Sequence, residues 1–377
     1  MAARPHPRGG RRQRPLFSVL IALLLLAGGA LVSVIPESCQ RAPVTRAVQF
    51  PRGMDEEDWK RATRRYESWS SSSDPGQPAP SAPPRDPLHV ALPGTMKQSA
   101  FVIEASAVLA SPLGEPLLAC LSAQTPELFE GLARAGVDPR RQIDRIAIVD
   151  DMAVVTGDFK GSKLDKLVPG ATTEAYGAHA KLLQRQDGEG DISGVWNDQV
   201  VVMGHSLEEV TQALDRLDGK GKPPEQLIPP QEAYGDVYGV MNPAMAGQLI
   251  GQGEGQLATR LQEVASRAAV HMDVANDLAL VMDLEGSQPD QVAGLGKAYV
   301  AALALARVQA AARGDTALAD ILGQGRAVPG MPGQTRMELA LPSATIQARL
   351  KECAARTKAA LPPVAATAKA PSEPDKQ

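Results

Sequence analysis

The sequence predicts an α+β fold: two ferredoxin-like βαββαβ repeats in tandem, preceded by a single N-terminal transmembrane helix and a disordered linker. Residues 143–159 have the pattern of two strands joined by a tight turn, and residues 270–284 repeat that pattern without a gap. The apolar run 16–35 carries no charge and has about the ~20 residues that a helix needs to cross a bilayer. Residues 70–87 are rich in proline and serine, which is typical of an extended spacer.

Composition limits the classes of protein to which the chain can belong. Its 377 residues leave room for two modest domains, and 44% hydrophobic residues indicate a globular body. Aromatic residues make up only 3%, so the core must be aliphatic. The formal net charge is −4 although residues 1–15 hold five arginines and no acid, so the remainder is more acidic still. An acidic body lacks the basic face that nucleic-acid phosphates require, and no nucleic-acid partner is expected.

The N-terminus predicts a membrane anchor. Residues 1–15 form a basic segment expected in the cytoplasm, and residues 16–35 form the transmembrane helix or signal anchor. The small residues Gly28, Gly29 and Ala30 offer the only fair signal-peptidase site, but they lie inside the apolar run rather than after it. This favours an uncleaved anchor in a bacterial inner membrane, with the body in the periplasm. The alternative is secretion after signal cleavage.

The segment 36–87 combines a juxtamembrane helix with the spacer. A helix is expected over residues 54–69, because its acids lie in the first turn and its bases follow, as the helix dipole favours. Trp59, Tyr66 and Trp69 fall on one stripe of this helix. The stripe could pack on the protein's own body, lie at the membrane surface or contact an envelope protein partner, and the sequence leaves all three open. A tail over residues 362–377 is also expected to be disordered.

The first repeat, 88–230, is predicted from local patterns. Its second helix should begin at Thr125 as N-cap, with Pro126 in the first turn, and end at Gly136. Ser206 and Glu209 form a capping box at the start of the last helix. The expected order is strand 101–105, helices 107–121 and 125–135, hairpin 143–159, helix 160–168, strands 181–186 and 200–203, and helix 206–217.

The second repeat, 231–361, follows the same order with a longer helix after the hairpin. The hairpins lie 126 residues apart and the last strands 137, so this helix absorbs the difference. The expected order is strand 236–241, helices 243–250 and 256–269, hairpin 270–284, helices 287–313 and 316–322, strand 337–341 and helix 343–355.

The repeat argues against a catalytic role for the carboxylate pair Asp150-Asp151. The equivalent place in the second repeat holds Asn276-Asp277. Two-residue hairpin turns favour Asn, Asp and Gly because these residues tolerate positive φ. Turn formation therefore explains the pair.

Other motifs point to no catalytic, cofactor or metal site. No two of the five histidines have metal-like helical spacing, and no cysteine lies near one. His205 follows a strand and precedes the helix cap Ser206, where a catalytic histidine could lie, but a solvent-exposed histidine at a strand end is the commoner case. The sequence Gly204-His-Ser206 lacks the second glycine of a nucleophile elbow. No catalytic, cofactor-binding or metal-ligating residue is assigned.

Two cysteines could be bonded to each other. Cys120 and Cys353 lie on expected helices of the first and last units, and a disulfide between them would close the body end to end. Two buried free thiols are the alternative, because pairing cannot be deduced from sequence alone.

The stretch from Phe101 to Phe159 contains Ser111-Pro-Leu-Gly, Gly136-Val-Asp-Pro139 and Ile143-Asp-Arg-Ile before a hairpin. It resembles a group of uncharacterised membrane-anchored envelope proteins of high-GC Gram-negative bacteria. This resemblance implies no activity and no site residues.

These observations favour a non-catalytic, membrane-anchored envelope protein, with a periplasm-facing tandem module for protein or ligand binding. The alternative is a hydrolase or a ligand-binding sensor that uses the cleft between the two repeats. The sequence leaves the ligand, the partner and the oligomeric state open.

Overall fold

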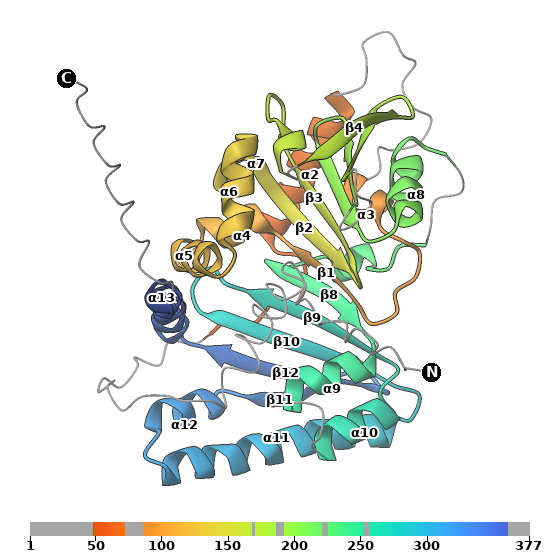
Figure 1. Cartoon of the computed structure of the whole chain (residues 1–377). Helices are drawn as coiled ribbons and strands as arrows, with labels where there is room; N and C mark the ends of the chain where they lie inside the picture. Colours follow the sequence, from red (N-terminus) through yellow and green to blue (C-terminus); the bar gives the residue numbers. More distant parts are fainter. Residues whose placement is uncertain are drawn as a thin grey trace, which may run out of the picture.

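The protein is a mixed α+β structure built on one large antiparallel sheet. The computed structural model describes residues 48–71, 86–167, 170–185, 192–220, 225–251 and 256–360. Within these ranges twelve strands form a single sheet in the order β11-β12-β10-β9-β8-β1-β2-β3-β7-β6-β5-β4. Figure 1 shows the sheet running through the molecule, with β4 at one end and β11 at the other.

The first half of the chain supplies seven strands. Each pairs with its neighbour in antiparallel orientation, so the chain turns back at every step from β1 to β3. The strands are β1 (Ser99–Ile103), β2 (Ile143–Val149), β3 (Met152–Gly157), β4 (Ala171–Tyr176), β5 (Ala180–Arg185), β6 (Ile192–Trp196) and β7 (Val200–Gly204).

The second half supplies five strands and joins the first through β8. Phe101 of β1 lies opposite Gly239 of β8, at the centre of a run of five residue pairs. The two halves are therefore continuous through hydrogen-bonded strands. The strands are β8 (Val237–Met241), β9 (Arg267–Asp273), β10 (Leu278–Glu285), β11 (Arg326–Pro329) and β12 (Gln334–Leu341).

Helices cover the sheet and its outer end. In Figure 1, α5 and α13 lie side by side, and α11 runs along the border of the molecule below β11 and β12. The helices are α2 (Glu56–Ser71), α3 (Pro87–Ala91), α4 (Ala105–Ala110), α5 (Gly114–Gln124), α6 (Pro126–Ala135), α7 (Pro139–Gln142), α8 (Leu207–Leu217), α9 (Pro243–Gly251), α10 (Gln256–Val264), α11 (Pro289–Ala312), α12 (Thr316–Leu322) and α13 (Ser343–Ala360). Two short 3₁₀ helices, η1 (Leu164–Lys166) and η2 (Pro230–Glu232), complete the secondary structure of the described residues.

The core has two layers because strand side chains alternate between faces. On β1, Phe101 and Ile103 belong to the layer under α5, α10 and α11, whereas Ala100 and Val102 belong to the layer under α3 and α8. All five residues of β1 are buried, which makes this strand the centre of the fold.

The hairpin β2–β3 forms as predicted, and its turn explains the carboxylate pair. Asp150 adopts a φ of 51°, in the left-handed region that Asp tolerates in tight turns. Its carboxylate accepts backbone N–H hydrogen bonds from Lys97 at 2.6 Å and Gln98 at 2.8 Å. Asp150 therefore holds the start of β1 against the turn.

The ferredoxin-like pairing predicted from the element order is wrong. In that split βαβ arrangement the first strand pairs in parallel with a later one, whereas β1 lies between β2 and β8 and pairs antiparallel with both. We call the paired strands β1 and β8 the seam. Outward from the seam, the strands of each half follow in chain order, β1-β2-β3-β7 in the first half and β8-β9-β10-β12 in the second. In the first half the three-strand meander β4–β6 occupies the place in the chain where the second half has α11 and α12.

Several local predictions also differ from the structure. The helix expected over 160–168 is reduced to η1, and the helix expected over 256–269 ends at Val264, since β9 begins at Arg267. Thr125 holds the N-cap position of α6, but its hydroxyl donates to the carbonyl of Leu121 instead of capping the helix.

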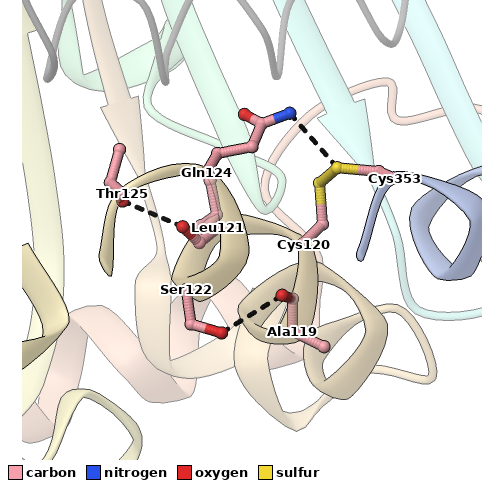
Figure 2. The surroundings of a disulfide bond; sticks show 7 residues. All are labelled: Ala119, Cys120, Leu121, Ser122, Gln124, Thr125 and Cys353. Carbon is pink, nitrogen blue, oxygen red and sulfur yellow. Dashed lines mark hydrogen bonds between the residues drawn. A yellow bond between two sulfur atoms is a disulfide. The ribbon is translucent and has the colours of Figure 1, made fainter. Parts of the chain in front are cut away.

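A disulfide joins the first half of the body to its last helix. Cys120 of α5 and Cys353 of α13 are bonded, with their Cα atoms 5.4 Å apart across a sequence separation of 233 residues (Figure 2). Figure 2 also shows the Gln124 amide donating to Cys353 Sγ at 3.2 Å. The bond closes the body end to end.

The expected membrane anchor, residues 16–35, lies outside the described residues, as do most of the spacer and the C-terminal tail. Among the helices that the structure does describe, none has both the length and the hydropathy to cross a bilayer.

Candidate functional site: the docking site of helix α2

Helix α2 begins with a reciprocal cap. The backbone N–H of Asp58 donates to Asp55 Oδ1 at 2.8 Å, and the N–H of Asp55 donates to Asp58 Oδ2 at 3.1 Å. This satisfies two of the backbone donors that a helix start leaves without partners. Glu56, Glu57 and Asp58 place negative charge in the first turn, where the helix dipole favours it.

The face of α2 that meets the body is charged. Asp58, Arg61 and Arg65 follow one another at helical spacing and point into the protein, with each side chain less than one fifth exposed. Trp59 points the other way and is 60% exposed. The helix is therefore held to the body by ion pairs, while its described tryptophan faces solvent.

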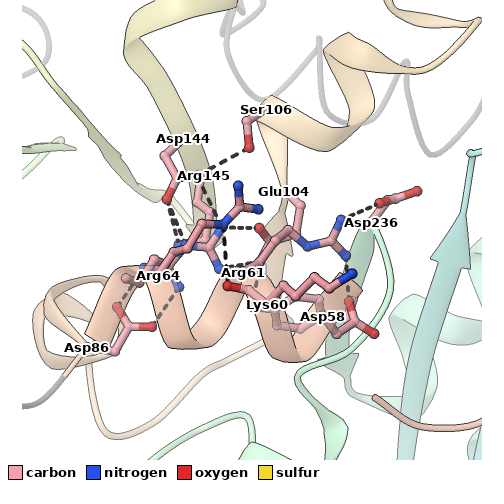
Figure 3. A network of polar contacts seen from close by, with 12 residues as sticks. Asp58, Lys60, Arg61, Arg64, Asp86, Glu104, Ser106, Asp144, Arg145 and Asp236 are labelled. Carbon is pink, nitrogen blue, oxygen red and sulfur yellow. Dashed lines mark hydrogen bonds and ion pairs between the residues drawn. The ribbon is translucent and has the colours of Figure 1, made fainter. Parts of the chain in front are cut away.

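Three acidic residues of the sheet form the seat for these arginines (Figure 3). Arg65 Nε donates to Asp144 Oδ2 at 2.8 Å, and its Nη atoms also bind the Glu104 carboxylate. Arg61 Nη1 donates to Asp236 Oδ1 at 3.4 Å and pairs with Asp58 of its own helix. We call Glu104, Asp144 and Asp236 the acidic seat.

Sheet topology explains why these three acids meet. Glu104 follows β1, Asp144 lies near the start of β2, and Asp236 precedes β8. Because β1 lies between β2 and β8 and pairs antiparallel with both, the end of β1 lies beside the starts of its neighbours. The backbone N–H of Glu104 donates to the carbonyl of Asp236 at 2.8 Å, which fixes this end of the seam.

A second ion pair lies beneath the seat. Arg145, next to Asp144 on β2, is 2% exposed and binds Asp86 through two hydrogen bonds of 2.6 and 2.7 Å. Burial alone would raise the pKa of Asp86, but the Arg145 charge outweighs it and lowers that pKa to about 2. Burial raises the pKa of Tyr238, whose hydroxyl donates to Glu104 Oε1 at 3.3 Å, and the Glu104 charge raises it further.

The chemistry of this site is charge pairing and docking. The acidic seat is occupied by two guanidinium groups, which between them pair with all three of its carboxylates. Across the residues that the structure describes, no three His, Cys, Asp or Glu side chains cluster in a way that could hold a metal ion.

The aromatic residues predicted as a contact stripe are only partly placed. Trp59 is exposed, while the side chains of Tyr66 and Trp69 lie outside the described residues. The charged docking face was missed, because the acids and bases of α2 were interpreted only through the helix dipole. The positions of Asp58, Arg61 and Arg65, three and then four residues apart, are the signal that could have indicated a buried stripe.

The residues considered for hydrolysis lie on the surface. Pairing of β3 with β7 places Ala153 opposite Met203, so Asp151 and His205 extend from the same end of the sheet. Both are exposed, and the hydroxyl of Ser206 accepts a 3.4 Å hydrogen bond from the N–H of Glu209 as the predicted helix cap.

Asp236 should make the stability of the protein depend on pH. Burial raises its pKa to about 6 from 3.8, and the neighbouring Asp273 charge adds to the increase, while the Val274 N–H and Arg61 act against it. The folded state then holds a proton more tightly than the unfolded state, so the contribution of Asp236 to stability is fully present below about pH 4 and is lost as pH rises through about 6. Asn at this position resembles the protonated acid and can still accept from Val274.

We therefore expect Asp236→Asn to match the parent near pH 4 and to be the more stable protein near pH 7. Urea unfolding across this range measures the difference. If the free energy of unfolding of Asp236→Asn falls between about pH 4 and 6 as much as that of the parent, another group causes the pH dependence.

No family model and no curated protein matches the chain. Among solved structures, crystal form I of TP0453 is similar with a TM-score of 0.40 and 9% sequence identity. The match covers 71% of this chain and 97% of that chain. A likeness of this size defines neither the fold nor the function.

Proposed function

We propose that the protein is a non-catalytic, membrane-anchored envelope protein whose α+β body faces the periplasm and binds a protein or a ligand there. The observation that carries the proposal is the Cys120–Cys353 disulfide, because such bonds persist in oxidising compartments outside the cytoplasm. The apolar segment 16–35, preceded by five arginines, supplies an anchor with the orientation that places the body on that side.

The buried charges support a structural and binding role over catalysis. Among the described residues, every carboxylate or guanidinium in the buried class has a partner of opposite charge within 4 Å. The halves meet through the paired strands β1 and β8, and this seam gives no support to a sensor or hydrolase site between them.

We further propose that the two halves are tandem repeats of one plan. Each has a strand, a helical layer, a hairpin, a fourth strand and a closing helix, with the same strand order outward from the seam. The repeated unit is a consecutive antiparallel meander with helices. The body would thus be a rigid platform, since one sheet spans both units.

Location is tested with the full chain in bacterial cells. A membrane-impermeant maleimide is expected to label Cys39 from the periplasmic side, and Cys120 and Cys353 only after reduction. Protease added to spheroplasts should digest the tether without lysis of the inner membrane. Labelling of Cys39 only after lysis, together with protection of the tether until lysis, would place the body in the cytoplasm and contradict the proposal.

The binding role is tested by crosslinking in the same cells. Trp59→Ala removes the exposed aromatic group of α2, and Glu57→Ala is its control on a neighbouring exposed position of the same helix. A defined crosslinked partner that is lost with the first variant and retained with the second would assign the contact to α2. Identical crosslinks in both variants would remove Trp59 from the binding surface.

A further inference from the structure

We propose that the outer face of helix α11 binds the surface of an anionic lipid bilayer. The proposal rests on the membrane anchoring proposed above, which would keep the body close to lipid. It adds a second contact with the membrane, made by the folded body itself.

Helix α11 is apolar on two sides. Its inner side buries Val292, Leu295 and Tyr299 against the sheet. Its outer side exposes Val300 to 43%, Leu305 to 61% and Val308 to 66%. A helix at the surface of a soluble protein normally has a polar outer side, so these three exposed apolar side chains mark the outer side of α11 as a face for a further contact.

The shape of this face suits a flat surface. The 24 residues of α11 span ~36 Å at about 1.5 Å per residue. The helix lies along the border of the molecule, beyond the edge strand β11 (Figure 1). The large exposed side chains are separated by exposed alanines at 301, 304, 311 and 312, which would let the helix lie close to a planar surface.

The positive charge of α11 favours an anionic lipid surface over other partners for its outer side. Residues 293–313 contain three exposed cations, Lys297, Arg307 and Arg313, and no acid, in a chain whose net charge is negative. No ion pair joins these cations to an acid among the described residues. The acids of the region lie at the ends, with Asp290 in the first turn of α11 and Asp315 and Asp320 beyond its last turn.

A second copy of the chain is a poorer occupant than lipid. A symmetric dimer presents the same surface from both subunits, so it would bring these three cations toward their own copies without an intervening acid. Anionic headgroups would offset all three, and the apolar side chains between them would enter the boundary of the acyl chains. Apolar residues flanked by Lys and Arg are typical of helices that lie in the membrane interface.

The test uses the full chain reconstituted into vesicles with brominated acyl chains, which quench tryptophan at the boundary. Leu305→Trp places a reporter on α11, and Leu207→Trp places one on α8, where Leu207 is 43% exposed. Emission of the parent gives the contribution of the native tryptophans. In vesicles of phosphatidylglycerol and phosphatidylcholine we expect the added emission at 305 to fall about two-fold or more, and that at 207 to be unchanged.

Charge dependence is tested by combining Leu305→Trp with Lys297→Gln, Arg307→Gln and Arg313→Gln. Quenching should be lost in this variant, and it should be absent for Leu305→Trp in vesicles of phosphatidylcholine alone. Unquenched emission at 305 in anionic vesicles, or equal quenching at 207, would overturn the proposal. So would a Leu305→Cys variant that crosslinks to its own copy in anionic vesicles. Retention of the chain on the vesicles after an alkaline wash reports the anchor separately, so the two proposals can fail independently.

Discussion

Arg145→Ala is expected to destabilise the protein by ~2–4 kcal/mol, because it removes a guanidinium that is almost fully buried and leaves the Asp86 carboxylate, which is 21% exposed, without its arginine partner. Arg145 is 2% exposed and forms two hydrogen bonds with Asp86. It lies under the docking site of α2, so its loss removes a charge from the interior rather than from the surface. Urea unfolding at neutral pH measures the change in the free energy of unfolding.

A pair of similar geometry whose arginine is more exposed provides the control. Arg336 binds Asp283 through hydrogen bonds of 2.7 and 2.8 Å, and Asp283 is 28% exposed, close to the 21% of Asp86, but Arg336 is 22% exposed where Arg145 is 2% exposed. Arg336→Ala should therefore cost about 1 kcal/mol or less. Equal losses for the two variants would show that burial of the Arg145 pair contributes little.

The pH dependence of the Arg145→Ala effect has a definite sign. In the parent, the pKa of Asp86 is lowered to about 2 from 3.8, so its contribution is present above about pH 4 and is lost as pH falls through about 2. Without Arg145, burial would raise that pKa instead, and the variant would lose stability as pH rises. The difference between parent and variant should therefore shrink in acid.

The elements that could be predicted from sequence are those decided by nearby residues. The alternating pattern of 143–159 predicted the hairpin, and the turn at Asp150 follows from its own backbone preference. The left-handed residue Gly136 ends α6 where expected. Ser206 caps α8 in the same local way.

Strand pairing could not be predicted in this way, because it is decided between distant residues. The pairing of Phe101 with Gly239 joins strands more than a hundred residues apart, and no local pattern specifies it. The strand β4 is polar and mostly exposed, so it lacks the apolar alternation by which strands are recognised. Element order alone was therefore compatible with more than one strand order.

The docking site of α2 could not be predicted for a related reason. The same charges would be expected on a helix surface exposed to solvent. Arg61 and Arg65 point inward because one end of three neighbouring strands brings the acidic seat together beside them. Aromatic residues commonly anchor interfaces, so the sequence favours the aromatic stripe as the contact face of this helix. In the structure the charged face makes the contact and Trp59 faces solvent.

Gly239→Ala is expected to cost ~2–4 kcal/mol, as overpacking a rigid part of a core does. A Cβ atom at this position would lie 2.3 Å from the carbonyl oxygen of Ala100 and 2.8 Å from the Cα of Phe101. Both are backbone atoms of β1, so relief requires the seam between the two halves to open. Gly294→Ala is the matched control: nothing lies within 4 Å of its Cβ position on α11, and alanine in a helix interior should stabilise by ~0.5–1 kcal/mol.

Unfolding of the Gly239→Ala variant also tests whether the two halves of the body unfold together. The β1–β8 seam joins them into one sheet, so the parent should unfold in a single transition with coincident signals from both halves. If Gly239→Ala weakens the seam more than either half, its transition should broaden and its denaturant slope should fall, because less surface is exposed in each step. Gly294→Ala should shift the midpoint upward and leave the slope unchanged. An unaltered midpoint and slope for Gly239→Ala would mean that β1 and β8 are not packed in the register that places Phe101 opposite Gly239.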